Sequence, residues 1–181
     1  RRVDHFVDSD GSRSRIAGNA ATLQDAALWV KCCLDLYEAT YDSGFLQSAE
    51  VAVNLVQQEF GPLDDGHGFH EAPKGIQLVV DRRRDYFDGA LPSGNATMAR
   101  NLLRMYELTG YANHEEMALH LVTASLARVG PYPMGAAELL LAVQSVSRGT
   151  PVVAIVGDPD LAETREMIRV ARDCRFPHLV T

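Results

Sequence analysis

The chain has 181 residues, and 46% of them are hydrophobic, which is enough to bury one sizeable core. Its formal net charge of −7 argues against a protein that binds nucleic acid or a membrane surface, because both partners are negatively charged. No apolar run approaches the roughly 20 residues that a membrane-spanning helix needs. We therefore expect one globular protein without nucleic-acid or membrane partners.

Apolar residues recur at helical spacing in five segments along the chain, after a start (residues 1–21) that lacks periodicity and is expected to be loop. The segments are residues 23–40, 45–60, 95–109, 114–128 and 136–147. Thr22 is a good N-cap for the first of them, and Asp25 stands in its first turn, where a carboxylate favours the helix dipole. The sequence predicts a mainly α fold of antiparallel helical hairpins.

The connection between the second and third helices, residues 61–92, is long and rich in Gly, Pro and Asp. Loops of this length in a compact domain are usually functional or disordered. Its apolar run at residues 76–80 predicts a small β-hairpin and hence an ordered connection. Its basic run, Arg82-Arg83-Arg84, is interpreted as a solvated loop because aspartates flank it on both sides.

The last part of the chain differs from the helical body. Residues 151–156 have the composition of a buried strand, and residues 161–172 have that of a helix. We expect residues 1–150 to form the helical domain and residues 151–181 to form a small βα tail that packs on it as one structural unit.

A repeat is present in the helical part. Leu36–Thr40 reads LYEAT and Met105–Thr109 reads MYELT, an offset of 69 residues (105 minus 36), and Ala49 matches Ala118 at the same offset. The repeating unit is therefore a hairpin with its connection, and such units stack so that neighbours bury each other's apolar faces. The repeat predicts an arc of hairpins in which helices 23–40 and 95–109 are parallel. Their N-termini, together with residues 88–95, then lie at one end, which suits a polar ligand.

The run Asp88-Gly-Ala-Leu-Pro-Ser-Gly-Asn95, with Asn101-Leu-Leu-Arg104 after it, resembles the signature of the spermatogenesis-associated protein 20 / thioredoxin-domain-containing protein family. Gln24–Ala27, Gly68-Phe69 and Val152–Gly157 add to the resemblance. It implies that the chain is the C-terminal part of an (α/α) toroid similar to six-hairpin glycosidases and sugar epimerases. The family's thioredoxin-like domain is not in this sequence.

The sequence departs from that family at three positions. His67 stands where the family tends to have Gly, His70 where it has an aromatic residue, and Gln24 where it has Glu. If residues 68–70 are extended, the two imidazoles point to opposite faces. We therefore predict no metal site, and no cofactor is expected.

Five side chains are candidates for the site. Asp25 and Asp88 are the candidate catalytic acid and base, and Ser93, Asn95 and Glu71 are the candidate substrate-binding residues. Two of these side chains have ordinary structural explanations, because Asp25 suits a first turn and Ser93 suits an N-cap. Tyr37 and Tyr106 are interpreted as core residues.

Two functions remain open at this stage. The first is a carbohydrate-active enzyme that uses carboxylate acid/base chemistry; sequence does not separate hydrolysis from epimerisation. The second is a non-catalytic scaffold, attached to a thioredoxin-like domain, that binds a ligand or partner. In both, the open edge of the arc is expected to be covered by further residues of a longer chain or by a second copy.

The adjacent cysteines Cys32 and Cys33 lack the C-x-x-C spacing of a redox pair and predict a reducing, cytoplasmic location.

Overall fold

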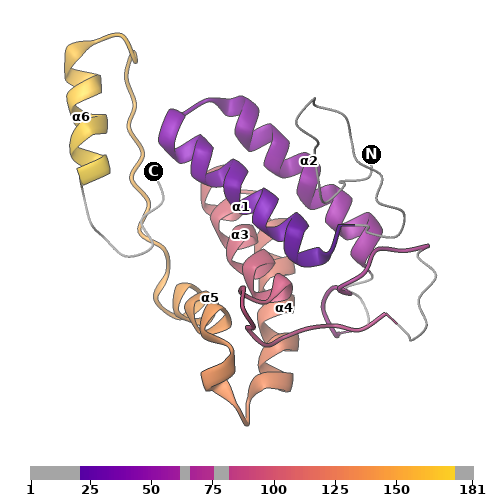
Figure 1. Cartoon of the computed structure of the whole chain (residues 1–181). Helices are drawn as coiled ribbons and strands as arrows, with labels where there is room; N and C mark the ends of the chain where they lie inside the picture. The colour runs from indigo at the N-terminus through magenta and orange to yellow at the C-terminus, as the bar shows by residue number, and fades with distance from the viewer. Residues whose placement is uncertain (1–20, 62–65, 76–81, 174–181) are drawn as a thin grey trace.

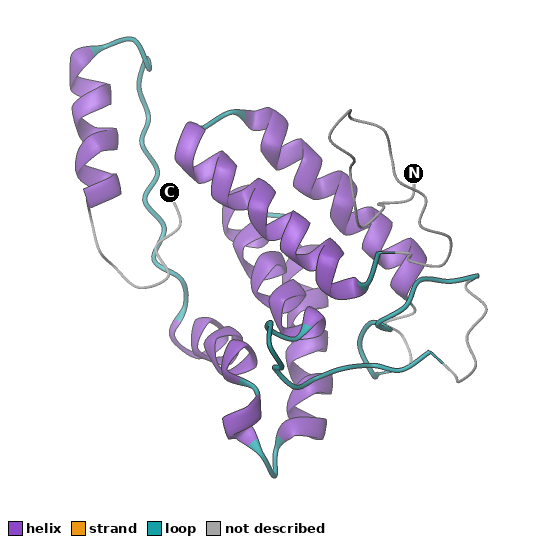
Figure 2. Ribbon diagram, viewed as in Figure 1, coloured by secondary structure: helices purple, strands orange, loops and turns teal. Residues whose placement is uncertain are grey.

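The computed structural model describes residues 21–61, 66–75 and 82–173, and these are mainly helical (Figure 1). The helices are α1 (Leu23–Thr40), α2 (Ser43–Phe60), α3 (Gly94–Thr109), α4 (Ala112–Val129), the 3₁₀ turn η1 (Pro133–Gly135), α5 (Ala137–Arg148) and α6 (Ala162–Asp173). The mainly α fold of antiparallel hairpins is confirmed. Figure 2 draws no strand in the described residues, and the β-hairpin predicted at residues 76–80 lies outside them.

The repeat is confirmed in the positions where the helices begin and end. The bounds of α2 and α4 differ by 69 at both ends (112 minus 43 and 129 minus 60). The C-caps Tyr41 and Gly110 are also 69 apart, and both have left-handed backbone conformations. Each cap donates its N–H to the carbonyl of the tyrosine four residues earlier. The two hairpins are therefore equivalent units.

Helix α3 is the centre of the packing, since it contacts α1, α4 and α5. Its N-terminus meets that of α1, where the Gln24 side-chain amide donates to the Pro92 carbonyl at 2.7 Å. Farther along, the Asn101 amide donates to the Ala27 carbonyl at 2.8 Å, and near the C-terminal ends Arg104 pairs with Glu38 at 2.8 Å. Because contacts occur along the whole length of both helices, α1 and α3 are side by side and parallel, as the repeat predicts.

Gly94 explains how the two helices come so close. A Cβ atom at this position would lie 2.9 Å from Leu23 Cγ and 3.0 Å from the Gln24 backbone nitrogen. The glycine leaves room for the neighbouring helix, because no larger side chain fits between the two N-termini. Fully buried apolar side chains form the core around this contact, among them Leu23, Leu34, Met98, Leu102 and Leu121.

The tail after α5 departs from its prediction. Residues 151–156 do not form a strand within the described residues; Val152 alone is a bridge residue, and the side chain of Val156 is 93% exposed. A strand needs a partner to satisfy its backbone groups, and no described segment lies beside it as a ladder. Figure 1 shows this extended segment and α6 standing beside the helical body.

Helix α6 is held to the body through Arg172. Its guanidinium donates to the Ala39 carbonyl at 2.6 Å and lies over the Tyr41 ring, 5.3 Å from the centroid. Between the tail and the C-terminal ends of α1 and α3 runs a groove of about 1000 Å³.

None of the helices in the described ranges has the length and apolar character that crossing a bilayer requires.

Candidate functional site

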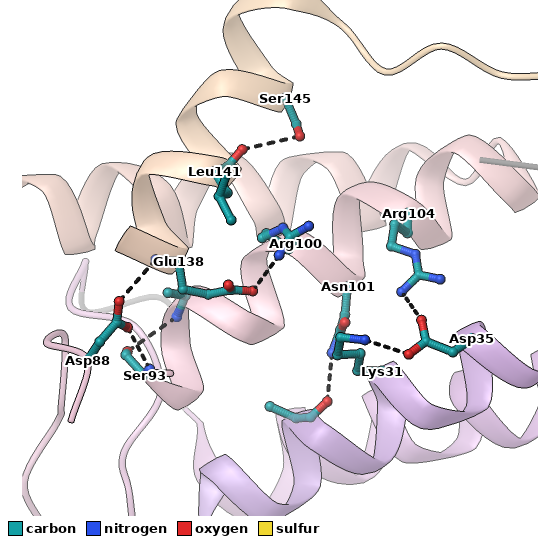
Figure 3. A network of polar contacts seen from close by, with 12 residues as sticks. Lys31, Asp35, Asp88, Ser93, Arg100, Asn101, Arg104, Glu138, Leu141 and Ser145 are labelled. Atoms are coloured by element: carbon teal, nitrogen blue, oxygen red, sulfur yellow. Dashed lines mark hydrogen bonds and ion pairs between the residues drawn. The ribbon is translucent and has the colours of Figure 1, made fainter. Parts of the chain in front are cut away.

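Asp88 connects the loop before α3 with the start of α5. Its Oδ1 accepts the Ser93 N–H at 2.9 Å, and its Oδ2 accepts the Glu138 N–H at 3.0 Å. Its own N–H donates to the Gly135 carbonyl at 2.7 Å. Helix α5 begins after Ala136, which offers no side-chain acceptor, so Asp88 serves as its N-terminal cap from a loop far away in the sequence (Figure 3).

Ser93 is the N-cap of α3. Its hydroxyl accepts the Ala96 N–H at 3.4 Å and donates to the Asp85 carbonyl at 3.2 Å, and only 3% of the residue is exposed. The capping interpretation is therefore confirmed. The hydroxyl also fastens the chain that leads into the helix.

Asn95 is fully buried and binds the connection between the hairpins. Its Oδ1 accepts the Phe69 N–H at 2.8 Å, and its Nδ2 donates to the carbonyls of Phe69 at 3.0 Å and Asp85 at 3.1 Å. The side-chain amide thus takes the place of a neighbouring strand for Phe69. A Cβ atom on Gly68 would lie 2.8 Å from Asn95 Oδ1, and Gly68 has a φ of +77°, so both features require glycine there.

Asp25 closes a capping box at the start of α1. Its Oδ2 accepts the Thr22 N–H at 2.8 Å and the Thr22 hydroxyl at 2.7 Å, while the Asp25 N–H donates to the Thr22 hydroxyl at 3.3 Å. The structural explanation for Asp25 is therefore correct. The capping box leaves the carboxylate partly buried at the end of the helix where the positive dipole points.

Glu71 stands at the same helix end as Asp25. Its backbone carbonyl accepts the Leu23 N–H at 2.9 Å, and its N–H donates to the Arg83 carbonyl at 2.8 Å. Burial and the nearby charge of Asp85 raise the pKa of the Glu71 carboxyl above its ordinary value.

The same carboxyl has neighbours that favour its ionised form. The Gln24 backbone N–H, the positive charge of Arg83 and the polar side chain of Thr22 lower the pKa of Glu71 and offset part of the rise. Asp25 binds Thr22, and Glu71 meets the same helix end through its carbonyl, which accepts the Leu23 N–H. Among the sequence-predicted site residues, they form one group at the N-terminus of α1.

The remaining three candidates form a second group. Asp88, Ser93 and Asn95 gather at the N-terminus of α3, and Asp88 extends this group to α5 rather than toward Asp25.

Two arginines that the sequence indicates as solvated also belong to this region. Arg82 donates to the carbonyls of Ala72 at 2.8 Å and Glu59 at 3.0 Å, and Arg84 donates to the Gly68 carbonyl at 2.9 Å. Only Arg83 of the run is exposed. The solvated interpretation is wrong for Arg82 and Arg84, because their guanidinium groups bind carbonyls of the connection and of the last turn of α2. The sequence of a charged run does not indicate which distant carbonyls its side chains will bind in the fold.

The two histidines of the connection contact different parts of the molecule. His70 Nδ1 is 2.9 Å from the Arg82 carbonyl, whereas His67 Nδ1 is 3.1 Å from an Arg128 nitrogen on α4. In the described ranges, no three metal-ligating side chains lie close enough together to hold an ion.

Comparison with known proteins identifies relatives over most of the chain. The sequence is 31% identical to spermatogenesis-associated protein 20 of Rattus norvegicus over 159 residues, which cover 87% of this chain and 20% of that protein. The chain is similar to spermatogenesis-associated protein 20, as its motifs indicate. The Homo sapiens protein is 30% identical over the same share, and an uncharacterized protein of Caenorhabditis elegans is 25% identical over 147 residues.

The match covers only part of each relative. The chain spans about a fifth of the length of spermatogenesis-associated protein 20 in Rattus norvegicus and Homo sapiens. No family model matches the chain.

Proposed function

We propose that the chain is part of a glycosidase- or epimerase-like (α/α) toroid that binds a hydroxyl-rich small molecule, of the carbohydrate class, at the N-terminal ends of α1 and α3. The parallel α1 and α3 present their positive ends together, and the connection before α3 is fastened over them by Asn95 and Ser93. Such an end favours carboxylates and sugar hydroxyls held by backbone N–H groups.

The observation that carries the proposal is that Glu71 and Asp25 stand together at the N-terminus of α1, where the Glu71 carbonyl accepts the Leu23 N–H and the Asp25 carboxylate binds Thr22. Burial raises the pKa of Glu71, while Asp25 accepts two hydrogen bonds from Thr22. Two carboxyls in different environments are what acid/base chemistry on a sugar requires, one to donate a proton and one to accept it. In this proposal Glu71 is the acid and Asp25 is the base.

Asp88 has a supporting role in the proposal. Both of its carboxylate oxygens accept backbone N–H groups, so it holds the entrance of α3 against α5 rather than presenting an oxygen to substrate. Ser93 and Asn95 likewise fix the loop before any ligand arrives, which is how a supporting shell keeps a site in place.

The test is a thermal-shift and calorimetric screen of the chain against free monosaccharides, with Glu71→Gln and Asp25→Asn as variants. We expect at least one sugar to bind the wild type and both variants to bind it at least tenfold more weakly, since each removes a charged hydrogen-bonding group. Glu71→Gln keeps the shape and the hydrogen-bonding oxygen, so its melting temperature at neutral pH should equal or slightly exceed that of the wild type.

Asp88→Asn is the matched control, because it changes one carboxylate at a neighbouring helix end. It should lower stability by about 1 kcal/mol through the cap of α5 and leave sugar affinity within a factor of about two. Equal affinity of Glu71→Gln, Asp25→Asn and wild type for a bound sugar would contradict the proposed pair, and so would a screen in which no sugar binds.

A second candidate function is a non-catalytic scaffold attached to a thioredoxin-like domain of a longer polypeptide. The saturated hydrogen bonding of Asp88, Ser93 and Asn95 favours it. Sugar binding without turnover in a protein of the relatives' length would select this function over the enzyme. The cytoplasmic location stays a prediction.

A further inference from the structure

Tyr41, the residue after α1, has a left-handed backbone conformation with a φ of 58°. Among the described residues, it is the only one besides glycines with a positive φ. This conformation is unfavourable for a bulky side chain, and such outliers point to a role that the surrounding structure supports. At the equivalent position of the repeat, Gly110 ends α3 in the same conformation without a side chain. Capping alone therefore does not explain a tyrosine at position 41.

The ring of Tyr41 has a partner that a glycine could not bind. The guanidinium of Arg172 on α6 lies over the ring, 5.3 Å from the centroid, and donates to the Ala39 carbonyl at 2.6 Å. An aromatic face and the C-terminal end of a helix both attract a cation. The Tyr41 hydroxyl is buried and has no hydrogen-bond partner among the described residues. The ring, rather than the hydroxyl, is therefore the part of Tyr41 that serves α6.

Helix α6 has few other attachments to the helical body. In the described ranges, no other helix packs extensively against it. Thr164 and Ala171 are its two buried residues, and Thr164 lies against Gly157 of the tail itself, where a Cβ atom would be 2.5 Å from the Thr164 hydroxyl. With 12 residues, α6 has a length at which an isolated helix is marginal in water. Its order therefore depends on docking.

The tail leaves the body at Gly149, directly after α5. Gly149 has a φ of 72° and a ψ of 165°, a combination that is essentially restricted to glycine. A Cβ atom placed there would meet no described atom within 4 Å. Rotation at this residue can therefore move the tail without disturbing a packed side chain.

We propose that residues 150–173 are a hinged strap that forms one wall of the groove beside α1 and α3, with Arg172 on Tyr41 as its latch (Figure 1). When the latch is released, the strap swings at Gly149 and opens the groove while α1–α5 stay folded. The groove has apolar and aromatic lining on both walls, among them Tyr37 and Leu108 from the body and Val153, Ile155 and Ile168 from the strap. The strap lies at the C-terminal ends of α1 and α3, so it is independent of the sugar site proposed at their N-terminal ends.

Hydrogen exchange of the 181-residue chain, measured by mass spectrometry, tests the latch. Arg172→Met keeps the length of the side chain but removes its charge and its donors. We expect exchange in α6 at least about fivefold faster than in the wild type, because the cation contact and the hydrogen bond are lost together. Protection in α1–α4 and the urea midpoint of the body should not change.

Arg169→Met is the matched control on the same helix. Arg169 pairs with Glu166 and Asp173 within α6, so its removal should change α6 exchange by less than about twofold.

Three variants test the ring of Tyr41. Tyr41→Phe keeps the ring, so α6 should exchange as in the wild type. Tyr41→Gly keeps the left-handed cap without the ring, so it should release α6 about as much as Arg172→Met does. The double variant should add nothing further, because both changes remove one contact.

The reactivity of a thiol in the groove reports its opening. In a background in which Cys32 and Cys174 are replaced by serine, Leu108→Cys places a thiol on the body wall of the groove. Its reaction with a maleimide should be at least about fivefold faster when Arg172→Met is also present, and unchanged with Arg169→Met.

Four results overturn the proposal. The first is α6 exchange that Arg172→Met and Arg169→Met change equally. The second is a double variant whose effect is the sum of the two single effects. The third is faster exchange throughout α1–α4, which would show that the tail is part of the cooperative body. The fourth is a thiol at position 108 whose reactivity does not respond to Arg172→Met.

Discussion

The two hairpins α1–α2 and α3–α4 have the same plan but different surroundings. Their second helices have the same bounds after an offset of 69, and their first helices end at equivalent left-handed caps. Yet α3 packs against three helices, whereas α1 packs, among the described helices, mainly against α2 and α3. The same local sequence pattern therefore yields a core helix in one place and a boundary helix in the other, and the difference lies in neighbours rather than in helix formation.

The two first helices also begin differently. The start of α1 is closed locally by the Thr22–Asp25 capping box. The start of α3 is closed by Ser93 together with contacts from Asp88, Phe69 and Asp85, which come from the connection. The start of the second hairpin thus depends on several side-chain contacts with the connection, whereas the first is capped within one turn and receives the Glu71 carbonyl from the connection.

The sharpest test of this comparison is the pair Met98→Ala and Trp29→Ala, which occupy equivalent positions. Met98→Ala should cost about 2–5 kcal/mol because it opens a cavity in a fully buried site. Trp29→Ala, measured by urea unfolding at a concentration where the chain is monomeric, should cost less than about 1 kcal/mol, since the ring is half exposed. Similar losses at the two positions would show that the exposed face of α1 around Trp29 is covered within the chain.

Asn95→Ala probes the dependence of α3 on the connection. The substitution leaves one buried N–H and two carbonyls without their side-chain partner, so we expect a loss of about 2–4 kcal/mol in the free energy of unfolding. Amide hydrogen exchange should also show faster exchange at Phe69. Unchanged stability combined with lost ligand affinity would instead identify Asn95 as a ligand-binding residue.

Gly94→Ala tests the close approach of α1 and α3. Alanine favours a helix by about 1 kcal/mol over glycine. Its Cβ would nevertheless lie 2.9 Å from Leu23 Cγ and 3.0 Å from the Gln24 nitrogen, so a net loss of about 1–2 kcal/mol is expected. Gly89→Ala is the control, because a Cβ there meets nothing within 4 Å, and its melting temperature should barely move.

Glu71→Gln gives the smallest effect, and the effect depends on pH. Burial raises the pKa of Glu71 in the folded chain, so the wild type holds this proton more tightly than the unfolded chain does. Wild-type stability from this group is present below the ordinary glutamate value of about 4.3 and is lost as pH rises through the raised value. The variant should therefore gain stability relative to the wild type across that window, by about 1 kcal/mol or less. A difference in urea midpoint that is constant with pH would show that burial of the carboxyl does not govern its ionisation.

The sequence by itself determined the helices and their repeat, because these depend on interactions within a few residues. Apolar spacing and the caps Thr22 and Ser93 place α1 and α3 almost to the residue, and the offset of 69 predicts that the two helices are parallel. The place of Gly94 opposite the start of α1 also follows from that offset.

Only the tertiary structure decided what the polar residues of the connection do. Asp88 caps a helix 50 residues away, Asn95 acts as a strand partner for Phe69, and Arg82 and Arg84 satisfy distant carbonyls. A local sequence pattern does not predict which distant segment will place an unsatisfied N–H or carbonyl within hydrogen-bonding distance. Strand formation at residues 151–156 also depends on distant residues. A segment with strand-like composition forms a strand only where another segment lies beside it to complete the hydrogen bonds.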